Sequence, residues 1–161
     1  MSNNYMELEA IAAELRKRAF ETIKVAKSGH LGASSSSTEL MTALYFHRLN
    51  YDIGNSKHPE RDRILVRGHL GPLRYSLFSL LGWINETELQ SYRSLGSRLQ
   101  GHESMSLPGV DLTPSGSLGM LLSYGAGIAL VAKKKRKNFL TYVFLGDGEE
   151  QEGNVSEAAR Q

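Results

Sequence analysis

The 161-residue sequence has no cysteine and only four prolines. Without cysteine, neither disulfides nor thiolate metal sites can form, and we expect a cytoplasmic protein. The sequence also lacks a run of about eighteen apolar residues, so we expect no membrane span. Its first residues contain no basic stretch followed by an apolar stretch, and we therefore expect no secretory signal.

A large excess of charge of either sign is also absent. Nineteen Lys and Arg against seventeen Asp and Glu leave a net charge of +2, which does not by itself imply a polyanionic partner. The positive charge is concentrated in residues 133–137, Lys-Lys-Lys-Arg-Lys. No aromatic residue interleaves this basic cluster, and it lies between a predicted helix and a predicted strand. A solvated turn is therefore favoured over a nuclear-targeting or nucleic-acid site, and we expect no nucleic-acid partner.

Apolar periodicity and capping patterns predict six helices, over residues 6–26, 36–49, 72–82, 85–96, 118–132 and 150–160. We expect a capping box of Ser36 and Glu39 at the start of the second helix, and Pro72 suits the first turn of the third. Two short apolar segments, residues 62–66 and 139–145, have the composition of buried strands.

Strands that alternate with helices predict an α/β fold with a mainly parallel sheet flanked by helices. No internal repeat or linker divides the sequence, so residues 1–161 are expected to form a single domain. Because the sequence stops inside the last predicted helix, we expect this domain to be truncated. In parallel sheets, ligands bind at the carboxyl ends of the strands. His69 and Asp147 follow the two predicted strands, which makes both of them candidate site residues.

Three separate loops each contain a Gly-His pair, at His30, His69 and His102. The glycine lets a ligand approach the backbone, and imidazole can donate to phosphate or sugar oxygens or move protons near neutral pH. Any single pair is more simply a turn glycine beside a surface histidine. Because three of the five histidines share this context, we predict a common site. Metal binding by the three is the less favoured alternative, since the usual zinc spacings are absent.

Asp147 lies between two glycines directly after the second strand. A carboxylate in this setting can face a divalent cation while backbone amides face a phosphate, and Mg²⁺ commonly takes one or two carboxylates plus phosphate oxygens. On the tripeptide alone, a tight turn between a strand and a helix is the favoured interpretation. Residues 113–119 form a second Gly- and Ser-containing loop, and its entry into a helix suits an anion.

These motifs, in this order, resemble the N-terminal domain of transketolases, which use thiamine diphosphate to move two-carbon ketol units between sugar phosphates. The resemblance covers residues 8–157. It rests on the following segments: Lys27-Ser-Gly-His-Leu-Gly32, Asp62-Arg-Ile-Leu-Val66 with Gly68-His69, Gln100-Gly-His102, Pro108-Gly-Val-Asp111, Gly116-Ser-Leu-Gly119, and Tyr142-Val-Phe-Leu-Gly-Asp-Gly148 with Gln151-Glu-Gly153.

The resemblance implies a thiamine diphosphate-binding fold and a role for each matching residue. His30, His69 and His102 match catalytic histidines that line the substrate channel. The implied cofactor contacts are His69, Gly116, Leu118 and Gly148, and the implied Mg²⁺ ligand is Asp147. Glu152 and Glu157 match carboxylates at a subunit interface, so a homo- or hetero-oligomer is expected.

The resemblance also implies that this chain does not act alone. The glutamate that activates the cofactor's pyrimidine belongs to a different domain in the family, and a second Mg²⁺ ligand lies beyond the match. We therefore expect a partner that supplies the pyrimidine-binding domain, and sugar phosphates as substrates. The alternative is a non-catalytic assembly subunit with little cofactor binding. It is favoured by departures from the family pattern at Leu31, Pro72, Ser104, Ser117 and Met120.

Overall fold

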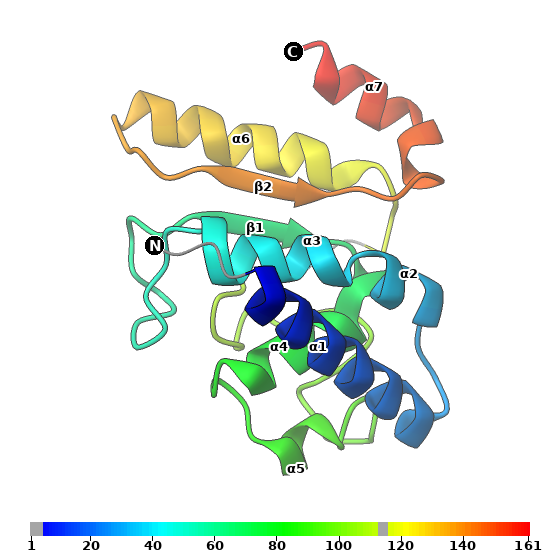
Figure 1. Cartoon of the computed structure of the whole chain (residues 1–161). Coiled ribbons are helices and arrows are strands. Elements are labelled where there is room, and N and C mark those ends of the chain that lie inside the picture. Colours follow the sequence, from blue (N-terminus) through cyan, green and yellow to red (C-terminus); the bar gives the residue numbers. More distant parts are fainter. Residues whose placement is uncertain (1–4, 113–115) are drawn as a thin grey trace. The chain divides into compact units, whose positions relative to one another are not determined.

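The computed structural model describes residues 5–112 and 116–161 (Figure 1). The chain divides into two compact units. Unit 1 consists of Met1–Leu49 and His69–Gly101, and unit 2 consists of Asn50–Gly68 and His102–Gln161.

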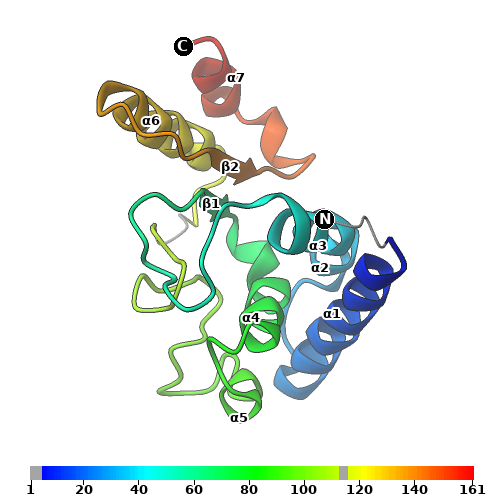
Figure 2. The ribbon, with the colours of Figure 1, turned by 60° about the vertical axis from the view of Figure 1, so that its left-hand side comes forward.

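Unit 1 is helical. Its elements are α1 (Tyr5–Ala26), α2 (Leu31–Ser36), α3 (Thr38–Ala43), a π-helical turn (Leu44–Arg48), α4 (Gly71–Leu80) and α5 (Glu86–Leu89). Helix α1 packs against α3 and α4 (Figures 1 and 2). Every residue of α4 from 71 to 78 is buried, and α1 contributes Leu15 and Ala19 to the same core. The core of unit 1 therefore surrounds α4.

Unit 2 contains the sheet. Strands β1 (Arg63–Val66) and β2 (Thr141–Phe144) pair in parallel, and helix α6 (Met120–Lys134) packs against both. The contact of α6 with the sheet is close at Gly125, where a Cβ atom would lie 2.4 Å from Val143 Cγ2. A short 3-10 turn (Glu149–Gln151) and helix α7 (Gly153–Ala159) follow β2, and α7 packs against α6.

The buried carboxylate of Asp62 fixes the start of the sheet. Its Oδ1 accepts a hydrogen bond from Leu140 N–H at 2.7 Å, and its Oδ2 accepts one from Asn50 N–H at 3.0 Å. Backbone donors bonded to a charged acceptor are well satisfied in the interior. Asp62 thus ties the entry of β1 to the entry of β2.

The parallel pairing, both strands, the helix predicted over residues 6–26 and the position of Pro72 at the start of α4 are confirmed. The capping box predicted for Ser36 and Glu39 is wrong. The Ser36 hydroxyl donates to Ala33 C=O, and Glu39 pairs with Arg16 of α1, so neither side chain caps a helix.

The helix predicted to reach about Gly96 is also wrong in length, because α5 ends at Leu89. Its start is as expected, since Asn85 Oδ1 accepts from Glu88 N–H at 2.7 Å. Turn-type hydrogen bonds follow α5, from Ser91 N–H to Glu88 C=O and from Tyr92 N–H to Leu89 C=O, and Arg93 then adopts a left-handed φ of 59°. In the part of the chain that the structure describes, no helix is long and apolar enough to cross a membrane.

Candidate functional site

Two of the predicted site histidines lie together in unit 1. His30 directly precedes α2, and His69 sits in the 3-10 turn Gly68–Leu70 that follows β1. Their ring centroids are 4.5 Å apart and the ring planes meet at 74°. His30 is exposed and His69 is half-buried. The edge-to-face pair therefore reaches the surface of this unit through His30.

Close packing at Gly29 places the first of these histidines. Gly29 has a φ of 144°, and a Cβ atom on it would lie 2.7 Å from Ile23 Cγ1 and 3.3 Å from Pro72 Cγ. Only glycine fits this conformation and this space. The chain can thus turn sharply between α1 and α2 and bring His30 beside the turn that carries His69.

The pKa of His30 is lowered from its ordinary value of 6.5. Partial burial of the ring is the largest cause, followed by the positive charges of His69 and Arg93. Arg93 donates a hydrogen bond to the Ser28 hydroxyl, two residues from His30. The arrangement favours a neutral imidazole at position 30, which can accept a proton near pH 7.

The third histidine lies in unit 2, beside a predicted cofactor-binding loop. A Cβ atom on Gly116 would be 3.6 Å from His102 Nε2, so this imidazole lies against the backbone of Gly116. His102, Gly116 and Leu118 are all exposed. Residues 113–115, which belong to the same predicted anion-binding loop, lie outside the described residues.

Asp147 and Gly148 follow β2 and are both exposed. The Asp147 carboxylate makes no hydrogen bond or ion pair with any residue that the structure describes. No atom lies within 4 Å of the place where a Cβ of Gly148 would be. A free carboxylate beside an open stretch of backbone fits a cation held together with a phosphate.

A cage of protein ligands is not present in the described residues, where no three His, Cys, Asp or Glu side chains cluster in a way that could hold a metal. Mg²⁺ does not require such a cage, because it usually keeps waters and phosphate oxygens among its ligands. The hard oxygen donor of Asp147 therefore fits Mg²⁺ that is bound together with a diphosphate.

Sequence reasoning missed three charged residues near these loops. In unit 1, Arg93 approaches Gly101 so closely that a Cβ there would lie 2.8 Å from its Nη2. In unit 2, the buried Glu149 accepts hydrogen bonds from two loop amides and lies 3.9 Å from Arg67. Arg67 could have been noticed as a charge between an apolar strand and a Gly-His pair. Nothing local distinguishes Glu149 from the exposed Glu150.

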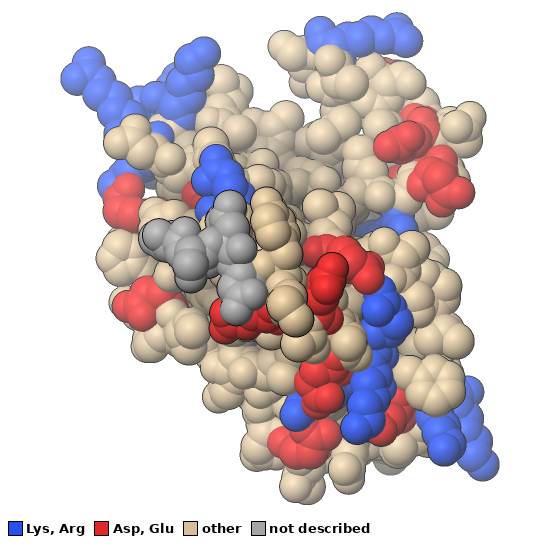
Figure 3. Space-filling view, viewed as in Figure 1, with Lys and Arg blue, Asp and Glu red and all other residues tan. Residues whose placement is uncertain are grey.

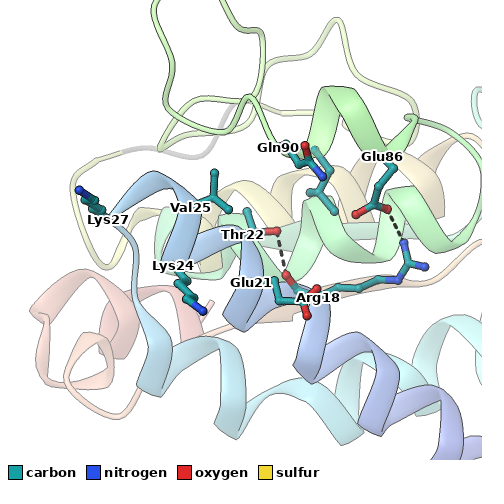
Figure 4. A pocket seen from close by; sticks show the side chains of 9 residues that line it. Arg18, Glu21, Thr22, Lys24, Val25, Lys27, Glu86 and Gln90 are labelled. Atoms are coloured by element: carbon teal, nitrogen blue, oxygen red, sulfur yellow. Dashed lines mark hydrogen bonds and ion pairs between the residues drawn. The ribbon is translucent and has the colours of Figure 1, made fainter.

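Two other surface features contain none of the predicted site residues. A groove of about 440 Å³ lies between α1 and α5 and has walls of mixed charge, with Arg18 bound to Glu86 at 2.7 Å (Figure 4). Lys and Arg side chains gather where α6 ends and the chain turns toward β2, at the exposed residues 133–137 (Figure 3). As predicted for a solvated turn, these five side chains are exposed.

The structure thus brings His30 to His69 and His102 to Gly116, each pair within one unit, and places Asp147 and Gly148 at the carboxyl end of a parallel strand. This position is where α/β proteins bind phosphate-bearing ligands. The fold defines an α/β protein, and its candidate ligand-binding residues lie in Gly-containing loops of the two units.

Comparison with known proteins identifies the family within this class. Residues 8–161 match the family described as the thiamine diphosphate binding domain of transketolase. The chain belongs to this family, and it has the thiamine diphosphate-binding fold. Among solved structures, a transketolase from Campylobacter jejuni superposes with a TM-score of 0.88 at 31% identity, over 94% of this chain and 25% of that one. A transketolase from Leishmania mexicana gives a TM-score of 0.86 at 29% identity, over 94% and 24%.

Two curated relatives carry the word subunit in their names. The chain is 36% identical over 153 residues to an apulose-4-phosphate transketolase subunit from Phocaeicola vulgatus, covering 94% of this chain and 54% of the relative. It is 37% identical over 161 residues to the 6-deoxy-6-sulfo-D-fructose transketolase subunit SqwG of a Clostridium species, covering 99% and 58%. The chain therefore spans a little over half the length of these relatives.

Proposed function

We propose that residues 1–161 form the diphosphate-binding domain of a transketolase whose pyrimidine-binding domain is carried by a partner chain. The assembly would transfer two-carbon ketol units from a ketose phosphate to an aldose phosphate, and we expect it to be a cytoplasmic oligomer. Support comes from the family match and from the similarity to two proteins that are named as transketolase subunits.

In this proposal, unit 2 holds the diphosphate and its cation. Asp147 would ligate Mg²⁺, while the backbone amides of the exposed residues Gly116, Leu118 and Gly148 would donate to phosphate oxygens. The observation that carries the assignment is the exposed Asp147 carboxylate, which has no partner among the described residues and lies beside open backbone at the end of β2. When bound, thiamine diphosphate supplies the carbon nucleophile that protein side chains lack.

The three histidines handle the sugar substrate and its protons. His30, with its lowered pKa, accepts the proton of a donor hydroxyl at a ring nitrogen. His69 packs edge-to-face against it, which fixes the orientation of both rings and leaves His69 able to donate to an oxygen of the cofactor or the sugar. His102 is exposed beside the Gly116 backbone, and its ring can donate to an oxygen of the substrate.

Calorimetric titration with thiamine diphosphate and Mg²⁺ tests the proposal, with the chain alone and with its candidate C-terminal partner. We expect Mg²⁺-dependent binding that Asp147→Ala abolishes and that Glu150→Ala, an exposed carboxylate three residues further on, leaves unchanged. Unchanged affinity in Asp147→Ala would contradict the metal assignment. No heat with or without the partner would overturn the enzyme proposal in favour of a non-catalytic assembly subunit.

A further inference from the structure

The carboxylate of Glu149 is buried between two loops of unit 2, and its residue is only 3% exposed. Its Oε1 accepts a hydrogen bond from Gly119 N–H at 3.0 Å, and its Oε2 accepts one from Gly146 N–H at 3.3 Å. Gly119 ends the loop before α6, and Gly146 begins the loop after β2. One side chain thus joins two segments that are far apart in the sequence.

Both glycines lie tightly against neighbouring side chains. Gly119 has a φ of 86°, and a Cβ on it would lie 2.8 Å from the Cβ of Glu152. A Cβ on Gly146 would lie 1.6 Å from Arg67 Nη1. The two backbone segments are therefore confined by their neighbours, and the Glu149 carboxylate satisfies the amides that this confinement buries.

Arg67 balances the buried negative charge. Its Nη1 lies 3.9 Å from Glu149 Oε2, and its side chain is 13% exposed. A buried carboxylate is costly unless it is paired and hydrogen-bonded. With two amide donors and one guanidinium, Glu149 meets both conditions.

We propose that Glu149 is a positioning residue, which holds residues 116–119 and 146–148 in the conformation that receives the diphosphate and its cation. The inference rests on the proposed function, which assigns Gly116, Leu118, Asp147 and Gly148 to that ligand. Loops that are ordered before binding lose less conformational entropy when the ligand arrives, and this raises affinity. Glu149 itself points into the protein and does not contact the ligand.

The test compares Glu149→Gln with Glu150→Gln in the chain assembled with its partner. Glutamine keeps one carbonyl acceptor, turns an amide donor toward the second N–H, and loses the attraction to Arg67. Without ligand, we expect upfield amide proton shifts and faster hydrogen exchange at Gly119 and Gly146 in Glu149→Gln only. We also expect thiamine diphosphate affinity to fall about ten- to hundredfold, the range for a charged hydrogen bond.

A further measurement separates positioning from a general structural role. At saturating cofactor, the KM of Glu149→Gln for the sugar donor should equal that of the unmodified assembly. If Glu149→Gln fails to fold, Arg67→Met tests the same contact from its other side, and we expect a smaller loss of affinity with the same two amides disturbed.

The possible failures are distinguishable. If the unmodified assembly binds thiamine diphosphate and Glu149→Gln, or Arg67→Met in its place, binds it equally well, the positioning role is overturned while the proposed function stands. If the two amides do not respond, the joining of the loops by Glu149 is overturned. If the unmodified assembly itself does not bind, the proposed function fails and this inference fails with it.

Discussion

Helix α4 of unit 1 and helix α6 of unit 2 differ strongly in burial. In unit 1, α4 is buried at every residue from 71 to 78. In unit 2, α6 buries only Leu121, Gly125 and Ala132, while Leu130 is 62% and Val131 51% exposed. An apolar hollow of about 420 Å³ lies along α6, with Phe139 on its wall.

The difference shows two ways to position a site. The His30 and His69 turns of unit 1 adjoin a core in which apolar area supplies the stability. Unit 2 contains fewer buried apolar contacts and several directed ones: Asp62 joins the starts of the two strands, Glu149 joins the loops at their other end, and α6 approaches the sheet closely at Gly125. Unit 1 should therefore be sensitive to lost volume, and unit 2 to added volume and lost charge.

The largest expected effect is on the core of unit 1. Leu73 is fully buried in α4, so Leu73→Ala should lower the free energy of unfolding by about 2–5 kcal/mol, measured by urea denaturation. Leu95→Ala, at a fully exposed position of the same unit, and Leu130→Ala on α6 should change it by about 0.5 kcal/mol or less. A loss of equal size at Leu73 and Leu130 would remove the contrast between the units.

A matched glycine pair tests the contact of α6 with the sheet. Gly125→Ala would place a methyl group 2.4 Å from Val143 Cγ2, and we expect it to destabilise unit 2 by about 1–3 kcal/mol. Gly127→Ala in the same helix meets no atom within 4 Å and should stabilise by about 0.5–1 kcal/mol. Thermal unfolding measures both effects, and a stabilising Gly125→Ala would show that the helix does not approach the sheet this closely.

The smallest expected effect is on the protonation of His30. His30 should titrate with a pKa below 6.5. His69→Ala should raise this pKa, because it removes part of the burial of the His30 ring and one nearby positive charge. NMR titration of the ring Hε1 proton measures this, with His47→Ala, an exposed residue of the π-helical turn, as the control. A His30 pKa above 6.5, or one that does not respond to His69→Ala, would contradict the pairing.

The same shift fixes the sign of a pH effect on stability. Because the folded state binds the His30 proton less readily than the unfolded state, His30 lowers stability as the pH falls below about 6.5. This loss of stability is complete only below the pKa of His30 in the folded state, and it is absent well above pH 6.5.

Periodicity and composition predicted the elements that depend on local chemistry. The first helix, both strands and the Asn85 cap follow from the spacing of apolar residues and from one short polar side chain. The capping box at Ser36 failed because Glu39 has a better partner, Arg16, which is 23 residues away in the sequence. Local rules cannot anticipate competition from a distant charge.

The residues of the candidate site likewise divide into those that a local pattern predicted and those that it did not. Gly-His pairs and the segment around Asp147 were recognisable because glycine beside one polar side chain is a local pattern. Glu149, Arg67 and Arg93 were missed because their importance comes from burial and from partners elsewhere in the chain.

The sequence by itself determined the class of this protein. The ordered Gly-rich loops after apolar segments indicate an α/β domain of the transketolase family, and the family match agrees. Only the tertiary structure decided which of several similar acidic residues is buried. Glu149 and Glu150 are neighbours of the same type, yet the fold gives one of them two backbone amides and a guanidinium and leaves the other in solvent. The reason is physical: burial of a charge depends on partners that long-range packing alone brings together.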